Sequence, residues 1–170
     1  MNFLELAKKR YSARSFSSKK ITPELLDTIL EAGRVAPSAS NRQPYQIIVV
    51  ESEEYLGKLK ECCHYYDAPT CMIISAEVDN GWTRNYDDKN HAEIDTTIVT
   101  DHMMLQAMDI GIDSLWICHF DPVKLVDMFE ISPELVPVHI LALGYSNKDP
   151  KSIDRHAKTR KTIEDKVKHI

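Results

Sequence analysis

The sequence predicts an α+β fold in which helices wrap a β-sheet, and two observations carry this prediction. Several segments place apolar residues at helical spacing behind a recognisable cap, and four short apolar runs are rich in β-branched residues. The two kinds of segment alternate irregularly, which favours α+β over a regular parallel α/β fold. A length of 170 residues is typical of one domain, so we expect residues 1–170 to fold as a single unit.

Two helices are expected near the N-terminus. Asn2 stands before FLELAKK with Glu5 three residues on, which is the layout of a capped helix start, and this helix should run to about Arg10. A second helix begins at Thr22-Pro23, because proline is well tolerated in the first helical turn, and it ends near Gly33.

Four strands and three further short helices are expected along the rest of the chain. The strands are continuous apolar runs, which suits burial on both faces: 46–50, 71–76, 114–120 and 138–145. A helix over 52–63 separates the first two runs, and Asp121-Pro122 opens another. The polar tail after Gly144 should end in a helix that starts at Thr162.

The segment from about 90 to 110 predicts how the chain assembles. Its apolar residues project around most of the helix circumference, so the predicted helix has no wide polar face. One small domain rarely surrounds such a helix by itself. We therefore expect a partner subunit, most simply a second copy in a two-fold homodimer.

Charge and cysteine usage limit the partners and the compartment. A formal net charge of -5 and a pI near 5.8 argue against general binding to nucleic acid or to a membrane surface. The four cysteines form no CxxC pair, the N-terminus lacks the apolar core of a signal peptide, and no apolar run approaches a membrane span. We expect a cytoplasmic protein with reduced cysteines.

Residues 10–14, RYSAR, are the first candidate binding motif. The five glycines stand alone, so there is neither a GxGxxG nor a Walker loop, and side chains must hold any bound phosphate. Guanidinium groups match phosphate oxygens bidentately, and Ser12 can add a hydroxyl. Alone the motif is weak, because Arg10 and Arg14 could be ordinary surface residues paired with nearby acids.

A polar loop between the second helix and the first strand is the second candidate. Pro37, Ser38, Asn41 and Gln43 offer several hydrogen-bonding groups to a planar polar ligand. The same residue types also form ordinary helix-to-strand connections, so both interpretations stay open.

RYSARSF, followed by ITPELLDTILEAGRVAPSASNRQPYQIIVV, resembles the start of the FMN-dependent nitroreductase family. The similarity continues through MDIGIDSLWICHFDP, HILALGY and AKTRK, and so covers nearly the whole chain. It implies a central mixed or antiparallel sheet wrapped by helices. It also implies an intertwined homodimer with a long buried interface helix, and a tail from about residue 146 that packs on the partner subunit.

The resemblance implies a role for each residue of the RYSAR motif. Arg10 and Ser12 match residues that hold the FMN phosphate and ribityl chain, and Tyr11 adds a backbone contact. Arg14 matches the cation near the pyrimidine edge of the flavin, where it would stabilise negative charge on the reduced ring.

The resemblance also implies ligands from distant parts of the chain. Pro37, Ser38 and Asn41 match a loop that reaches a flavin held mainly by the other subunit. Lys158 and Arg160 match a second pair of phosphate ligands.

The residues expected around the flavin ring depart from the commoner family pattern. Small residues usually follow the tryptophan and isoleucine, whereas this chain has Cys118 and His119, whose backbone alone could serve. The long segment 78–90 could close over the site, with Trp82, Arg84 and Tyr86 as candidate substrate contacts.

The resemblance implies a flavin-dependent oxidoreductase. NADH or NADPH would reduce bound FMN, and a nitroaromatic, a quinone or a similar small electron acceptor would reoxidise it by a ping-pong mechanism, with no catalytic side chain required. A non-reductase role on the same fold stays open: flavin storage, sensing or fragmentation, or reductive dehalogenation.

Two rival interpretations of the cysteines are weak. Cys62, Cys63 and His64, with Cys118 and His119, lack the spacing of zinc ligands, so no metal is expected. Cys118 and His119 would point to opposite faces of a strand, which separates a nucleophile from its base.

Overall fold

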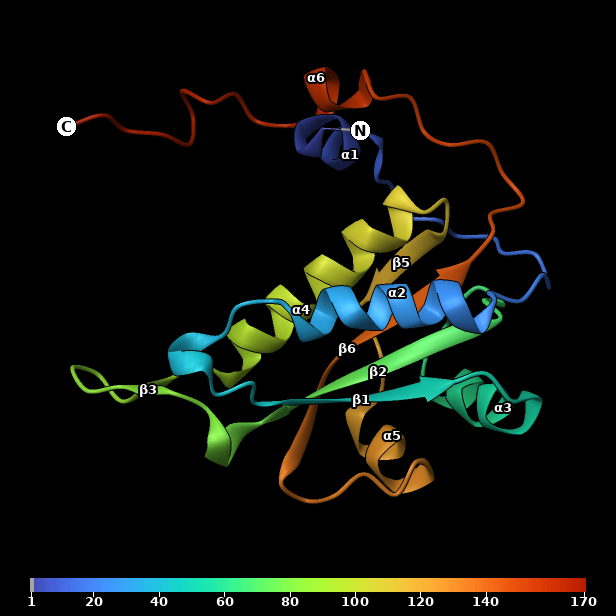
Figure 1. Ribbon diagram of the computed structural model, residues 1–170, viewed down its shortest axis with the longest axis horizontal. Coiled ribbons are helices and arrows are strands. Elements are labelled where there is room, and N and C mark those ends of the chain that lie inside the picture. The colour runs from blue at the N-terminus through green and yellow to red at the C-terminus, as the bar shows by residue number, and fades with distance from the viewer. Residues whose placement is uncertain (1) are drawn as a thin grey trace.

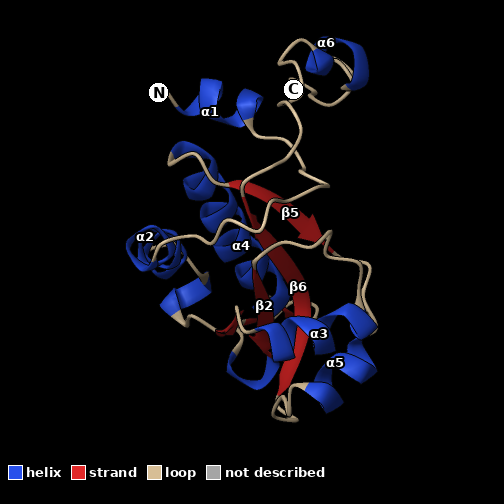
Figure 2. Cartoon of the chain, turned by 90° about the vertical axis from the view of Figure 1, so that its right-hand side faces the viewer, coloured by secondary structure: helices blue, strands red, loops and turns tan. Residues whose placement is uncertain are grey.

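The computed structural model describes residues 2–170, and its main sheet lies between two layers of helices (Figures 1 and 2). The sheet has the strand order β1-β2-β6-β5, and every neighbouring pair is antiparallel. The strands are β1 (Tyr45–Val50), β2 (Thr70–Glu77), β5 (Asp113–Ile117) and β6 (Leu135–Gly144). The predicted α+β fold with an antiparallel sheet is therefore confirmed.

Two main helices cover each face of the sheet. They are α2 (Pro23–Arg34) and α4 (Ala92–Asp109) on one face, and α3 (Glu53–Cys62) and α5 (Pro122–Met128) on the other. Successive residues of the central strand β2 divide between the two cores: Met72 and Ile74 pack with α2 and α4, whereas Cys71 and Ile73 pack towards α3 and α5. Because both faces of a central strand are buried, most of its residues are apolar, and its sequence contains a continuous apolar run.

Burial on both faces, expected for all four strands, was wrong for β1. Gln46 is exposed, and Ile47, Ile48 and Val49 are only half-buried. β1 is an edge strand that pairs with β2 alone. Within this chain it is therefore not covered on both sides as a central strand is.

Side-chain caps explain three of the six α-helix starts in the described residues. In α1 (Phe3–Lys9) the Asn2 side chain accepts a hydrogen bond from the Glu5 N–H at 2.9 Å. Asp121 accepts from the N–H groups of Val123 and Lys124, each at 3.1 Å, at the start of α5. These two starts were predicted correctly, as was the start of α2 at Pro23.

The tail differs from the prediction. Its helix is α6 (Arg155–Thr159), and no helix begins at Thr162. Thr162 and Asp165 do exchange side-chain to backbone hydrogen bonds, at 3.1 and 3.2 Å, as a helix start would. Because residues 160–170 are exposed, no apolar packing supports continuation of that turn.

The long segment between β2 and α4 is folded rather than irregular. After the short helix η2 (Val78–Asn80) it forms a hairpin of β3 (Thr83–Arg84) and β4 (Lys89–Asn90), which projects from the body beside η1 (Ala39–Asn41) (Figure 1). Gly81 allows the turn after η2 to pack closely against the start of α4, because an added Cβ would lie 2.8 Å from Ala92 Cβ.

α4 is buried on one side only within this chain. Val99, Met103 and Ala107 are fully buried against the sheet and α2, whereas Ile94 is 40% exposed. Leu105 lines an open groove of about 790 Å³ between α1, α2 and α4. The homodimer stays a prediction, and α4 retains apolar surface for it. Within residues 2–170, no helix has the length and hydropathy that crossing a bilayer requires.

Candidate functional site

The RYSAR segment is extended chain that runs beside β5. α1 ends at Lys9, after which Ser12 forms a parallel bridge with Ser114 and the Ala13 N–H donates to the Ser114 carbonyl at 2.9 Å. The pairing fixes the segment on the sheet edge, so its side chains alternate between the core and the surface.

This alternation separates the residues of the motif by role. Tyr11 and Ala13 are buried, at 6% and 1% exposure, so only the backbone of Tyr11 is available to a ligand. Arg10, Ser12 and Arg14 are directed away from the core. Four residues of extended chain place the two arginines about 13 Å apart. They can therefore contact different parts of one elongated ligand.

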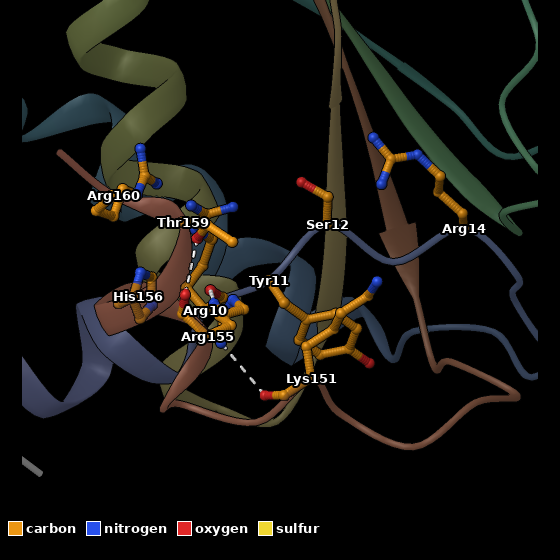
Figure 3. Close-up of a pocket in the computed structure, with 9 residues that line it drawn as sticks. All are labelled: Arg10, Tyr11, Ser12, Arg14, Lys151, Arg155, His156, Thr159 and Arg160. Atoms are coloured by element: carbon orange, nitrogen blue, oxygen red, sulfur yellow. Dashed lines mark hydrogen bonds between the residues drawn. The ribbon is translucent and has the colours of Figure 1, made fainter.

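Arg10 and Ser12 line a cavity of about 370 Å³ that also includes the tail (Figure 3). The lining residues are mostly cationic or hydroxyl-bearing: Arg10, Tyr11, Ser12, Arg14, Lys151, Arg155, His156, Thr159 and Arg160. No acidic residue of the described chain lines it. The first and last parts of the sequence thus meet in one positively charged site.

Hydrogen bonds hold the tail on the N-terminal segment of the same chain. Arg155 Nη2 donates to the Arg10 carbonyl at 2.5 Å, and His156 Nε2 donates to the Lys8 carbonyl at 3.0 Å. Arg155 Nη1 also donates to the carbonyls of Lys151 and Ser152, at 3.3 and 2.8 Å. The Arg155 guanidinium is therefore committed largely to holding α6 in place.

Two other guanidinium groups of the cavity, those of Arg10 and Arg160, are available to an anion. Within residues 2–170, neither Arg10 nor Arg160 makes an ion pair or a side-chain hydrogen bond. Burial lowers the pKa of Arg10, and the charges of Arg155 and Arg160 lower it further, with Asp101 acting in the opposite direction. Protonated guanidinium groups that repel one another are stabilised by a bound anion, so this arrangement favours a phosphate.

Arg14 connects this cavity to a second one, of about 190 Å³. That cavity lies at the end of β5 and is lined by Arg14, His64, Tyr66, Leu115, Trp116, Ile117, Cys118 and His119. Figure 3 shows the Arg14 guanidinium on the far side of Ser12 from Arg10, Arg155 and Arg160. The site is thus elongated, with a cationic end and a more apolar end.

His139 of β6 supports the floor of the second cavity. Its Nδ1 accepts a hydrogen bond from the Trp116 indole N–H at 2.9 Å, and its Nε2 is 3.0 Å from Thr97 Oγ1. The Thr97 hydroxyl donates to the Glu93 carbonyl, so Nε2 must be the protonated nitrogen, and the imidazole is neutral. Burial lowers its pKa from 6.5 to about 4. Cys118 Sγ is 3.9 Å from Nδ1 of this ring.

Within one chain, the structure does not bring the predicted loop to the cationic cavity. Pro37, Ser38 and Asn41 lie near the N-terminal end of α4, whereas α1 packs beside its C-terminal half. Lys158 is exposed and does not line the cavity, although Arg160 does. A role for these loop residues in flavin binding therefore requires a second chain.

The three candidate substrate contacts also lie apart from both cavities. Trp82 packs edge-on against His91, with ring centroids 5.1 Å apart, and Arg84 is paired with Asp87. Tyr86, at 96% exposure, is at the hairpin tip. Their contact with substrate stays a prediction, and it too needs the partner subunit.

The sequence prediction missed the tail residues that complete the cavity, notably Lys151, Arg155 and Thr159. Arg155 lies five residues before Arg160, and this basic spacing in an acidic chain was the available signal. Among the described residues, no group of three His, Cys, Asp or Glu side chains is arranged to hold a metal ion.

Known proteins share this architecture. The Nitroreductase family model matches residues 7–65 and 56–145, which is more than half of the chain. A solved structure of a nitroreductase family protein from Clostridium difficile 630 superposes with a TM-score of 0.97 at 43% identity, covering 99% of this chain and 98% of that one.

Two curated relatives extend the comparison. A Methanothermobacter thermautotrophicus protein provisionally named NADH dehydrogenase/NAD(P)H nitroreductase is 27% identical, over 91% of this chain and 82% of its own. The Bacillus subtilis FMN reductase (NAD(P)H) is 24% identical, over 93% of this chain and 69% of its own. The chain belongs to the nitroreductase family, as its sequence predicted.

Proposed function

We propose that the protein is an FMN-dependent NAD(P)H oxidoreductase that reduces small aromatic electron acceptors, nitro compounds and quinones among them. The observation that carries this proposal is the cavity in which Arg10, Arg155 and Arg160 face one another without a carboxylate. The names of its relatives, an NAD(P)H nitroreductase and an FMN reductase, support the same cofactor and electron donors.

The donor set fits the phosphate end of FMN. Arg10 and Arg160 have free guanidinium forks for bidentate contacts, and Ser12 adds a hydroxyl. Arg155 contributes charge while it holds α6 in position. The phosphate is thus recognised by side chains, which suits a sequence without a glycine-rich phosphate loop.

The second cavity fits the other end of the cofactor. Arg14 supplies a cation where negative charge develops on a reduced ring, and Cys118 and His119 offer backbone donors beside it. When bound, FMN supplies the hydride and electron transfer. The chain binds and orients it, and leaves one ring face for the donor and the acceptor in turn, which gives ping-pong kinetics.

A homodimer completes the proposed site. Pro37, Ser38 and Asn41 line neither cavity of their own chain, so a second copy would supply them. The apolar surface left on α4, with the groove beside it, supports such an interface. Sedimentation at micromolar concentration should give a dimeric mass, and a monomeric mass would contradict this part of the proposal.

Anaerobic reduction tests the function. The purified protein should carry or take up FMN, and NADH or NADPH should bleach its visible absorbance within the mixing time of a manual assay. Adding a nitroaromatic or a quinone should restore the absorbance. A protein that binds FMN but is bleached by neither nucleotide would instead indicate a non-reductase flavin protein.

A further inference from the structure

Asp95 is a buried acidic residue outside both cavities. It lies in the first turn of α4 and is 2% exposed. Its Oδ1 accepts a hydrogen bond from the Ala39 backbone N–H at 3.0 Å, whereas its buried Oδ2 has no partner within residues 2–170. Burying a carboxylate this completely is costly, so the single bond that it makes requires an explanation.

The loop that Asp95 contacts is held in an unfavourable backbone conformation. Ser40, Asn41 and Gln43 have φ angles of 52°, 54° and 51°, in the left-handed region that L-residues avoid. Three such residues within four positions persist only where the surroundings enforce them, and such strain is commonly found at functional sites.

Few interactions enforce this conformation from outside the loop. Within the loop, Gln43 N donates to Ser38 Oγ at 3.0 Å, and Gln43 Nε2 donates to the Asn41 carbonyl at 3.0 Å. Arg42 Nη1 also donates to the carbonyls of Asn80 and Gly81, at the end of η2 and just after it, but at the long distances of 3.5 and 3.4 Å. Asp95 makes a shorter bond, and it ties the loop to α4, which packs on the sheet.

We propose that Asp95 is a positioning residue that fixes the loop of residues 37–43 for flavin binding. This inference rests on the proposed function, in which Ser38 and Asn41 reach the flavin of the partner subunit. Asp95 lines neither cavity of its own chain, and its one side-chain hydrogen bond within residues 2–170 is from the Ala39 N–H, so it acts through that group. The oxygen that accepts this hydrogen bond, rather than the negative charge, is the functional feature.

A matched set of variants separates the bond from the charge. Asp95→Ala removes both, whereas Asp95→Asn keeps an acceptor oxygen of the same shape. Glu93→Ala removes an exposed acid from the same helical turn and so controls for charge near the helix N-terminus.

Hydrogen exchange of the free protein tests the hold on the loop without any cofactor. Amides of residues 39–43 should exchange at least tenfold faster in Asp95→Ala than in the parent, and at parent rates in Asp95→Asn and Glu93→Ala. Equal exchange in Asp95→Ala and the parent would overturn the proposal. If Asp95→Ala does not fold, fast loop exchange in a folded Asp95→Asn overturns it as well.

Affinity for FMN and for riboflavin tests the consequence. Asp95→Ala should raise the dissociation constants of both ligands by the same factor, about tenfold, because the loop is proposed to contact the part that they share. Arg10→Ala should weaken FMN alone. Lower thermal stability of Asp95→Ala with parent affinities would mean a purely structural role and overturn the proposal. A parent that binds neither ligand overturns the proposed function and the flavin role together, and the exchange rates still decide whether Asp95 holds the loop.

Discussion

Replacing His139 with glutamine should make the free energy of unfolding depend less on pH between pH 6.5 and pH 4. His139 is 9% exposed and binds Trp116 and Thr97 as a neutral ring, and its pKa is lowered from 6.5 to about 4. In the unfolded chain this histidine takes up a proton below about pH 6.5, whereas the native ring stays neutral down to about pH 4. The contribution of the neutral His139 ring to the free energy of unfolding is therefore fully present above pH 6.5, and it is lost as the pH drops towards 4.

The size of this loss follows from the two pKa values. At 1.36 kcal/mol for each tenfold change in proton concentration, the parent loses about 3 kcal/mol of unfolding free energy between pH 6.5 and pH 4, and about 2 kcal/mol by pH 5. His139→Gln cannot titrate, so the stability advantage of the parent over this variant should shrink by the same amounts.

Urea denaturation followed by circular dichroism measures the difference. Parent, His139→Gln and His169→Gln are compared at pH 7.5, 6.0 and 5.0, with His169 as an exposed tail histidine that should leave the pH dependence unchanged. If the parent and His139→Gln have parallel stability curves, the native ring titrates normally and the neutral hydrogen-bonded state is wrong.

Three further predictions concern the tail, the cysteines and Gly81. Arg155→Ala should weaken FMN binding about tenfold and raise proteolysis of residues 150–160, because it releases α6 from the Arg10 carbonyl; unchanged proteolysis would contradict this. A thiol reagent should modify the exposed Cys118 quickly and the buried Cys63 slowly, since burial raises the Cys63 pKa to about 12, and four equally fast thiols would contradict that burial. Gly81→Val should lower the melting temperature by several degrees, because its Cβ would collide with Ala92 Cβ, whereas an unchanged value would show that the turn after η2 does not pack on α4 as described.

Local signals predicted the strands and most helix starts, because their causes are local. The run CMIISA alternates between two cores, and Asn2 and Asp121 cap the helices that follow them. The helix expected from Thr162 failed although its capping bonds form, since the residues after it bury nothing. Helix formation there depends on packing, which the local sequence does not record.

The candidate site was only partly predictable for the same reason. Arg10 and Arg160 were identified because motifs carry them, but Arg155 contacts the Arg10 carbonyl across 145 residues of sequence, a contact that no local pattern encodes. Extended chain beside β5 separates Arg10 from Arg14, because Ser12 and Ala13 pair with Ser114.

The proposed phosphate site is tested most directly by the affinity of the protein for FMN and riboflavin, measured by fluorescence titration of the flavin-free protein. Arg10→Ala and Arg160→Ala should each weaken FMN binding by about 10- to 150-fold, the effect of losing a charged hydrogen bond worth about 1.5–3 kcal/mol, and should leave riboflavin unchanged. Lys20→Ala, at an exposed lysine outside the cavity, should bind both like the parent. FMN affinity that is equal in the parent and both arginine variants would contradict a phosphate site between the RYSAR segment and the tail.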